Sequence, residues 1–151
     1  MKKQVFTIEE AKKKLEYYCI YRDRSHREVM QKLHEMNIIP EAIDQIILHL
    51  IKENFLNEER FARSFVRGKF YQKKWGKNKI RQALKRHDIH PNLIEKAFME
   101  IDREDYQKTI QKLIKKKTSE YREMNPYKLK QKISNYLIQK GYGYQDFSDL
   151  I

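Results

Sequence analysis

An internal repeat is the feature that most constrains the fold of this chain. Residues 25–50 align with residues 76–101 at an offset of 51 positions, and the helix-starting Pro40 falls on Pro91. The other matched pairs are Val29 with Ile80, Leu33 with Leu84, Ile38 with Ile89, Ile43 with Ile94 and Leu50 with Ile101. A weaker third copy follows at an offset of 53. A period of this length, with helical spacing inside it, predicts an array of small helical units.

The predicted fold class is all-α, with three tandem three-helix repeats forming an elongated, curved array. We expect one domain over residues 1–151, with repeats at about 7–56, 57–103 and 104–151. Helix-starting signals recur along the chain: Thr7 and Ser25 each have glutamate three positions later, and Asn57 precedes two glutamates. The expected buried face of the third helix is Ile43, Ile46, Ile47, Leu50 and Ile51. Residues 144–151 should form a short last helix. No stretch shows the strict apolar and polar alternation of a half-buried strand.

The charge of the chain is unevenly divided among the repeats. The net charge is +12, from 33 Lys and Arg against 21 Asp and Glu. Residues 7–56 hold 8 basic and 9 acidic side chains, whereas residues 57–103 hold 13 and 6, and residues 104–151 hold 10 and 6. Such a charge indicates a polyanion, or a protein wrapped on one, as the partner. The middle repeat is therefore the predicted docking unit.

The run from residue 60 to residue 86 is rich in Lys and Arg and contains no Asp or Glu. Its arginines at 60, 63 and 67 share one helix face, because residues at these spacings lie on the same side. Such density suits contact with phosphates. The alternative is an ordinary solvated helix surface, against which the missing acidic partners argue. The candidate partner-binding or DNA-binding residues are Arg60, Arg63, Arg67, Lys69, Lys73, Lys74, Trp75, Lys77, Lys79 and Arg81.

Two further features leave alternatives open. Trp75, the only tryptophan, could stack on a base or anchor an interface, or could simply pack between helices. The third repeat has a smaller basic cluster at Lys112 and at 115–117. That cluster is either a solvated helix end or a secondary anion contact.

The sequence offers no signal for enzymatic chemistry. The histidines form no zinc-binding motif, and no phosphate-binding loop, dinucleotide fingerprint or nucleophile elbow occurs. We therefore expect no catalytic residue, no metal and no cofactor. A single cysteine, Cys19, fits a reducing compartment. No apolar run approaches the length of a membrane span, so the expectation is a cytoplasmic protein with no membrane partner.

The chain resembles the RecX family of bacterial regulatory proteins. The segment 55–66, with its acidic pair before Arg-Phe-Ala, carries most of the resemblance. The supporting elements are Arg24-Ser25 with Glu28 and Leu33, Gly76 with Ile80 and Leu84, and Gly141-Tyr142-Gly143-Tyr144 with Phe147. The resemblance covers about residues 8–151.

The resemblance implies a non-enzymatic modulator of the RecA recombinase. Members of this family bind the RecA filament on DNA, lie along its groove, and suppress ATP hydrolysis and strand exchange. The implied partners are the RecA filament and single- or double-stranded DNA, contacted directly or through the filament. The alternative is a direct DNA-binding protein without recombinase specificity, because lysine and arginine serve both kinds of contact.

Overall fold

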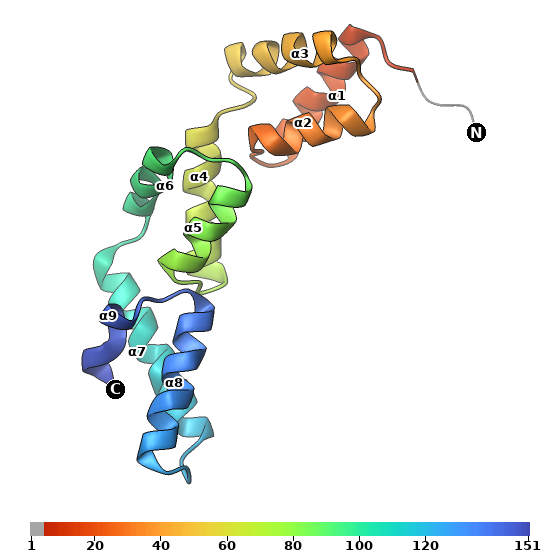
Figure 1. Cartoon of the computed structure of the whole chain (residues 1–151). Helices are drawn as coiled ribbons and strands as arrows, with labels where there is room; N and C mark the ends of the chain where they lie inside the picture. The colour runs from red at the N-terminus through yellow and green to blue at the C-terminus, as the bar shows by residue number, and fades with distance from the viewer. Residues whose placement is uncertain (1–4) are drawn as a thin grey trace.

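Three groups of helices follow one another along an elongated, curved molecule (Figure 1). The computed structural model describes residues 5–151, and within this range no strand forms. Unit 1 comprises α1 (Ile8–Tyr21), α2 (His26–Glu35) and α3 (Pro40–Lys52). Unit 2 comprises α4 (Glu58–Arg67), the π-helical turn η1 (Gly68–Gln72), α5 (Lys77–Arg86), α6 (Pro91–Ala97) and the 3-10 turn η2 (Phe98–Glu100). Unit 3 comprises α7 (Arg103–Glu120), α8 (Pro126–Lys140), α9 (Tyr144–Phe147) and the 3-10 turn η3 (Ser148–Leu150). The predicted fold class is confirmed.

The helices begin where their capping signals predict. The Thr7 hydroxyl accepts from the Glu10 amide at 3.1 Å, and the Glu10 carboxylate accepts from the Thr7 amide at 3.3 Å. Ser25 and Glu28 form the same reciprocal pair, with both distances 3.1 Å. Asn57 accepts from the amide of residue 60 at 2.9 Å. Each cap satisfies a backbone donor that the first turn leaves unpaired.

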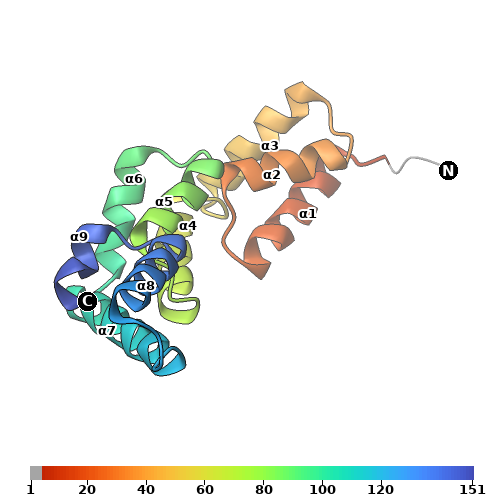
Figure 2. The ribbon, with the colours of Figure 1, turned by 60° about the horizontal axis from the view of Figure 1, so that its bottom comes forward.

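Two hydrophobic cores form. The first lies within unit 1 and is built from Ala11, Leu15, Cys19, Val29, Leu33, Met36, Ile43, Ile46, Leu50 and Leu56. The second runs without a break through units 2 and 3, from Phe61 to Phe147. Figure 2 accordingly shows unit 1 set apart, while the helices of units 2 and 3 crowd together. Units 2 and 3 therefore share their apolar stabilisation, and unit 1 has its own.

Details of three elements differ from the expectation. Ile51 is 42% exposed and Ile47 only half-buried, because the α3 face that contacts α1 and α2 is narrower than its apolar stripe. The last helix is short: α9 ends at Phe147 and gives way to η3. The end of α4 widens into the π-helical η1, which nothing in the local sequence signals.

The joint between units 1 and 2 is polar. Asp23 accepts from the Arg60 guanidinium at 2.8 Å, and the Ser25 hydroxyl lies 3.1 Å from Nδ1 of His87. His26 lies 3.3 Å from the Glu58 carboxylate. This joint is therefore held by side-chain hydrogen bonds and ion pairs that connect the two cores.

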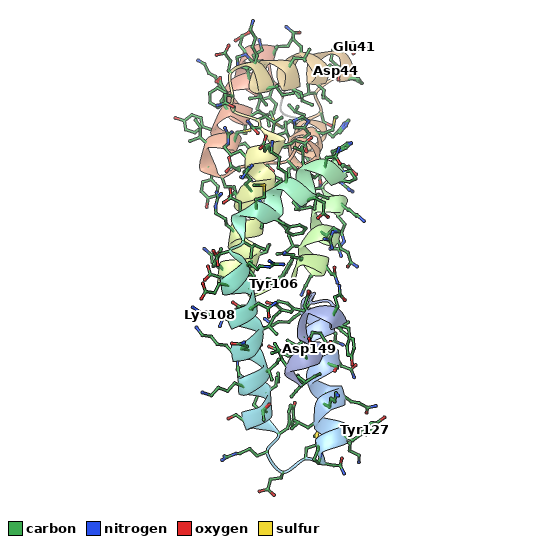
Figure 3. All side chains as sticks on the ribbon, turned by 90° about the vertical axis from the view of Figure 1, so that its left-hand side faces the viewer. Glu41, Asp44, Tyr106, Lys108, Tyr127 and Asp149 are labelled. Atoms are coloured by element: carbon green, nitrogen blue, oxygen red, sulfur yellow. The ribbon has the colours of Figure 1, made fainter. Side chains whose placement is uncertain are left out.

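The joint between units 2 and 3 is a close backbone contact. The Gly76 amide donates to the Lys140 carbonyl, and the Asn78 amide donates to the Gly141 carbonyl, each at 2.8 Å. Figure 3 labels Tyr106 at this level of the molecule, near the start of α7. Its ring lies 5.3 Å from that of Tyr142, and burial raises the pKa of Tyr106 to about 12. The joint combines short backbone bonds with a buried aromatic cluster.

Candidate partner-binding surface

The arginines of α4 share one face, as their spacing predicts, but that face is internally neutralised. The Arg63 guanidinium lies 3.2 Å from the Glu59 carboxylate and 3.0 Å from that of Glu100. Arg67 contacts the same Glu100 carboxylate at 3.2 Å. Hydrogen bonds from Arg63 and Arg67 lower the pKa of Glu100. Much of the positive charge of α4 is therefore satisfied within the unit.

Arg60 holds units 1 and 2 together. Its guanidinium donates to Asp23 at 2.8 Å and to the carbonyls of Asn54 and Phe55 at 3.1 Å each. These partners belong to unit 1 and to the segment that links it to α4. A guanidinium with this many acceptors acts as a structural brace.

Arg81 on α5 is likewise paired. It donates to the Glu95 carboxylate and to the Asn78 side chain, each at 2.8 Å. The expectation that the run 60–86 lacks acidic partners is therefore wrong for most of its arginines. Their partners lie outside the run, on the loop before α2, in the first turn of α4, on α6 and in η2, and folding brings them together.

The lysines of the same run are different. None of Lys69, Lys73, Lys74, Lys77 and Lys79 forms an ion pair among residues 5–151. Lys73 and Lys74 are exposed. Lys77 lies with its ammonium 4.9 Å from the Tyr106 ring, and its amide donates to the Tyr106 hydroxyl at 3.1 Å. The charge available to a partner on unit 2 is therefore carried mainly by lysine.

Trp75 organises two of these lysines. The ammonium of Lys79 lies 4.4 Å from the centre of its indole ring, and that of Lys69 lies 4.8 Å away. The indole itself is half-buried against the core of units 2 and 3. A cation over an aromatic face is attracted to it, which restricts a flexible side chain. The packing interpretation of Trp75 is therefore supported, and stacking on a base or anchoring an interface stays a prediction.

A small open hollow of about 190 Å³ lies beside the first joint. It is lined by Arg22, Asp23, Phe61, Ser64, Phe65, Gly68, Lys69, Gln72 and Lys73. Arg22 also contacts Glu28 at 3.1 Å. Unit 1 therefore places Arg22 beside the lysines of unit 2, although its guanidinium, like those of α4, already has a carboxylate partner. This proximity could not be predicted from sequence, because Arg22 and Lys69 are brought together only by the fold.

The basic cluster of unit 3 lies along the second half of α7. Lys117 is satisfied locally, with Glu120 at 3.0 Å and the ring of Tyr136 at 4.3 Å. Lys112, Lys115 and Lys116 are exposed. Lys140, at the end of α8, was not a candidate from sequence, yet its ammonium donates to a carbonyl of unit 2 at 3.1 Å.

Two further properties of the described residues concern metal binding and membrane insertion. Within residues 5–151 no group of three or more His, Cys, Asp or Glu side chains is arranged to hold a metal ion. In the same range no helix combines the length and the apolar character that crossing a membrane requires.

The fold and this surface define a helical-repeat protein with a basic central unit, and comparison with known proteins specifies its family. The family description "RecX, second three-helix domain" matches residues 57–97, and "RecX, third three-helix domain" matches residues 93–151. The chain belongs to the RecX family of regulatory proteins.

Individual relatives agree with this assignment. The regulatory protein RecX of Haemophilus influenzae (strain PittGG) is 30% identical over 87% of this chain and 86% of its own length. That of Clostridium botulinum (strain Alaska E43 / Type E3) is 32% identical over 85% of this chain, which spans only 60% of that relative. The crystal structure of RecX from Lactobacillus salivarius has a TM-score of 0.86 at 25% identity, covering 94% of this chain and 92% of that one.

Proposed function

We propose that this chain regulates the RecA recombinase by binding the RecA filament on DNA and inhibiting its ATP hydrolysis and strand exchange. The observation that carries the proposal is family membership, which rests on matches to two successive RecX domains over residues 57–151. The net charge of +12 supports a partner that is, or is wrapped on, a polyanion. The chain acts by binding, and no residue is assigned a catalytic role.

The shape of the molecule supports binding across more than one subunit of a filament. The 18 residues of α7 alone extend about 27 Å. Units 1, 2 and 3 follow one another along a curved path. A protein that bridges neighbouring protomers would resist the subunit movements that accompany ATP hydrolysis. The effect should be stoichiometric, and it should weaken with salt because lysine supplies the free charge.

The test is ATP hydrolysis by pre-formed RecA filaments on single-stranded DNA. Added protein should lower the rate progressively, with saturation near a stoichiometric ratio. Lys69→Gln/Lys73→Gln, which removes two cations beside the first joint, should require several-fold more protein for the same inhibition. The matched control is Lys13→Gln/Lys52→Gln on the exposed surface of unit 1, which should behave like the wild type. Unchanged hydrolysis and strand exchange at saturating protein would refute the proposal.

A second candidate function is direct DNA binding without recombinase specificity. The observation in its favour is a set of lysines on unit 2 that form no ion pair within residues 5–151 and that suit phosphate contact wherever the phosphates are. It predicts equal affinity for bare DNA and for the filament, with the same steep salt dependence. A clear preference for the filament at matched salt would exclude it.

A further inference from the structure

Lysines from units 2 and 3 meet at the second joint. The Lys140 ammonium donates to the Lys73 carbonyl at 3.1 Å, and the Lys140 carbonyl accepts from the Gly76 amide at 2.8 Å. Lys79 lies directly against Gly141, so close that a Cβ on that glycine would be 2.4 Å from the Lys79 Cβ. The end of α8 is therefore seated on the turn that carries Lys73 and Lys74.

No carboxylate of residues 5–151 forms an ion pair with the lysines at this joint. Among residues 5–151, none of Lys74, Lys79, Lys116 and Lys140 forms an ion pair, in contrast to the arginines of α4. Burial, together with the positive charges of Lys79, Lys74 and Lys116, lowers the pKa of Lys140. Like charges gathered at a half-buried place repel one another, and a bound anion would relieve that repulsion.

The backbone at Lys74 indicates that the charge is kept there at a cost. Its φ is +59°, in the left-handed region. The other non-glycine residues with positive φ in the described chain are Asn37, Asn54 and Asp88, all types that tolerate this region. Each of these three follows the end of a helix, as Lys74 follows η1. The left-handed region is unfavourable for an ordinary side chain such as lysine.

The turn is nevertheless held firmly. The Tyr142 hydroxyl donates to the Lys74 carbonyl at 2.7 Å, and the Lys74 amide donates to the Phe70 carbonyl at 2.8 Å. Lys74 is thus an exposed cation on a fixed backbone, supported by a buried tyrosine of unit 3. Strain of this kind, when the surroundings enforce it, is concentrated at binding and active sites.

We propose that the second joint binds the phosphodiester backbone of a nucleic-acid strand, with phosphates contacted by Lys74 and Lys79 of unit 2 and by Lys140 of unit 3. Trp75 positions Lys79 through its ring. The inference deepens the proposed function, because it assigns this joint to the DNA of the filament and not to the recombinase.

A nucleic-acid strand suits the joint better than an acidic protein surface does. Lysine acts as a point charge that tolerates the varied positions of phosphates along a strand, whereas arginine is the side chain that grips a carboxylate with a fork of two hydrogen bonds. Here the arginines of α4 are already occupied by the chain's own carboxylates, and the free cations are lysines. The cluster also joins two units, so it can follow a strand along the array.

The test measures binding of the full chain to a fluorescein-labelled oligodeoxythymidine as a function of salt, by fluorescence anisotropy. Lys74→Asn should weaken binding several-fold and reduce the slope of log affinity against log salt by about 0.7, the value for one phosphate contact on a single strand. The same substitution should raise the urea midpoint of unfolding, since asparagine tolerates the left-handed region. Lys74→Asn/Lys79→Gln/Lys140→Gln should weaken binding by more than about tenfold and lower the slope by about 2.

The control is Lys128→Asn/Lys130→Gln, which removes exposed cations near the start of α8, about 15 Å from Lys140 along the helix. It should leave affinity and slope nearly unchanged. An unchanged slope in Lys74→Asn, or an equal loss in the control, would overturn the inference. The inference would also be overturned if the lysine variants of this joint lost filament binding but kept oligonucleotide binding, because the joint would then contact an acidic protein surface. A wild-type chain that binds the oligonucleotide as described but does not affect RecA would refute the proposed function alone.

Discussion

Gly76→Ala should open the joint between units 2 and 3. A Cβ at this position would lie 2.3 Å from the carbonyl carbon of Gly141, 2.4 Å from its oxygen and 2.4 Å from the Tyr142 nitrogen. All three atoms are backbone, so no side chain can rotate away, and the end of α8 must move. The movement would break the two 2.8 Å hydrogen bonds that join Gly76 to Lys140 and Asn78 to Gly141.

The expected cost follows from these contacts. Inserting a methyl group into a closed contact costs about 1–3 kcal/mol, and each buried hydrogen bond contributes about 1 kcal/mol net. The free energy of unfolding of units 2 and 3 should therefore fall by about 3–5 kcal/mol. For a cooperative unit of the size of units 2 and 3 together, that corresponds to a melting temperature lower by at least roughly 10 °C.

Gly68→Ala is the matched control. Gly68 has ordinary helical dihedrals, and nothing lies within 4 Å of its added Cβ. Alanine should raise the free energy of unfolding there by about 0.5–1 kcal/mol, because it restricts the unfolded chain. Urea unfolding followed by circular dichroism measures both variants. If Gly76→Ala unfolds at the wild-type midpoint, or if both variants shift in the same direction, the description of the joint is wrong.

Three further predictions concern titratable groups. Burial raises the pKa of Cys19 to about 11, so Ellman's reagent at mildly alkaline pH should modify it much more slowly than in urea-unfolded protein; equal rates would show that the core of unit 1 is open. Burial lowers the pKa of His87, because it favours the neutral imidazole. The contribution of this neutral side chain to the free energy of unfolding is complete above about pH 6.5 and is lost as pH falls through the lowered pKa. His87→Gln should therefore flatten the decline in urea midpoint between neutral pH and about pH 5, and an unchanged decline would contradict the assignment. Arg63 holds the pKa of Glu100 below its ordinary value of 4.5. The contribution of the ionised Glu100 carboxylate to the free energy of unfolding is therefore complete above pH 4.5 and is lost as pH falls through the lowered pKa. Glu100→Gln should remove that part of the acid sensitivity, and a urea midpoint that declines as in the wild type below pH 4.5 would argue against it.

The sequence predicts the helices well because their signals are local. Thr7, Ser25 and Asn57 cap helices through residues three positions away, and Pro40 and Pro91 stand at the first turn of theirs. The repeat then implies the three-unit array, since copies with the same apolar spacing fold in the same way. The exposure of Ile51 could not be predicted from spacing alone, because burial depends on which neighbouring helix covers a face.

The candidate surface could be predicted only in part. The sequence locates the basic charge in the middle unit, but it cannot show which cations are already paired. Arg63 and Glu100 are 37 positions apart and meet only in the folded chain. The conformation of Lys74 and the approach of Lys140 to unit 2 are also tertiary, because they depend on how α8 ends against the turn after η1. The fold therefore shows that the charge available to a partner is carried mainly by the lysines, because most of the arginines are already paired.

The measurement that tests the central claim most directly is binding to a pre-formed RecA filament and to bare single-stranded DNA, at the same salt concentration and with the same labelled protein. A filament regulator should bind the filament at physiological salt with an affinity at least tenfold higher than for bare DNA. Contact between the lysines and the strand should still give measurable binding to bare DNA at low salt. Equal affinities at every salt concentration would contradict the account and leave a DNA-binding protein without recombinase specificity.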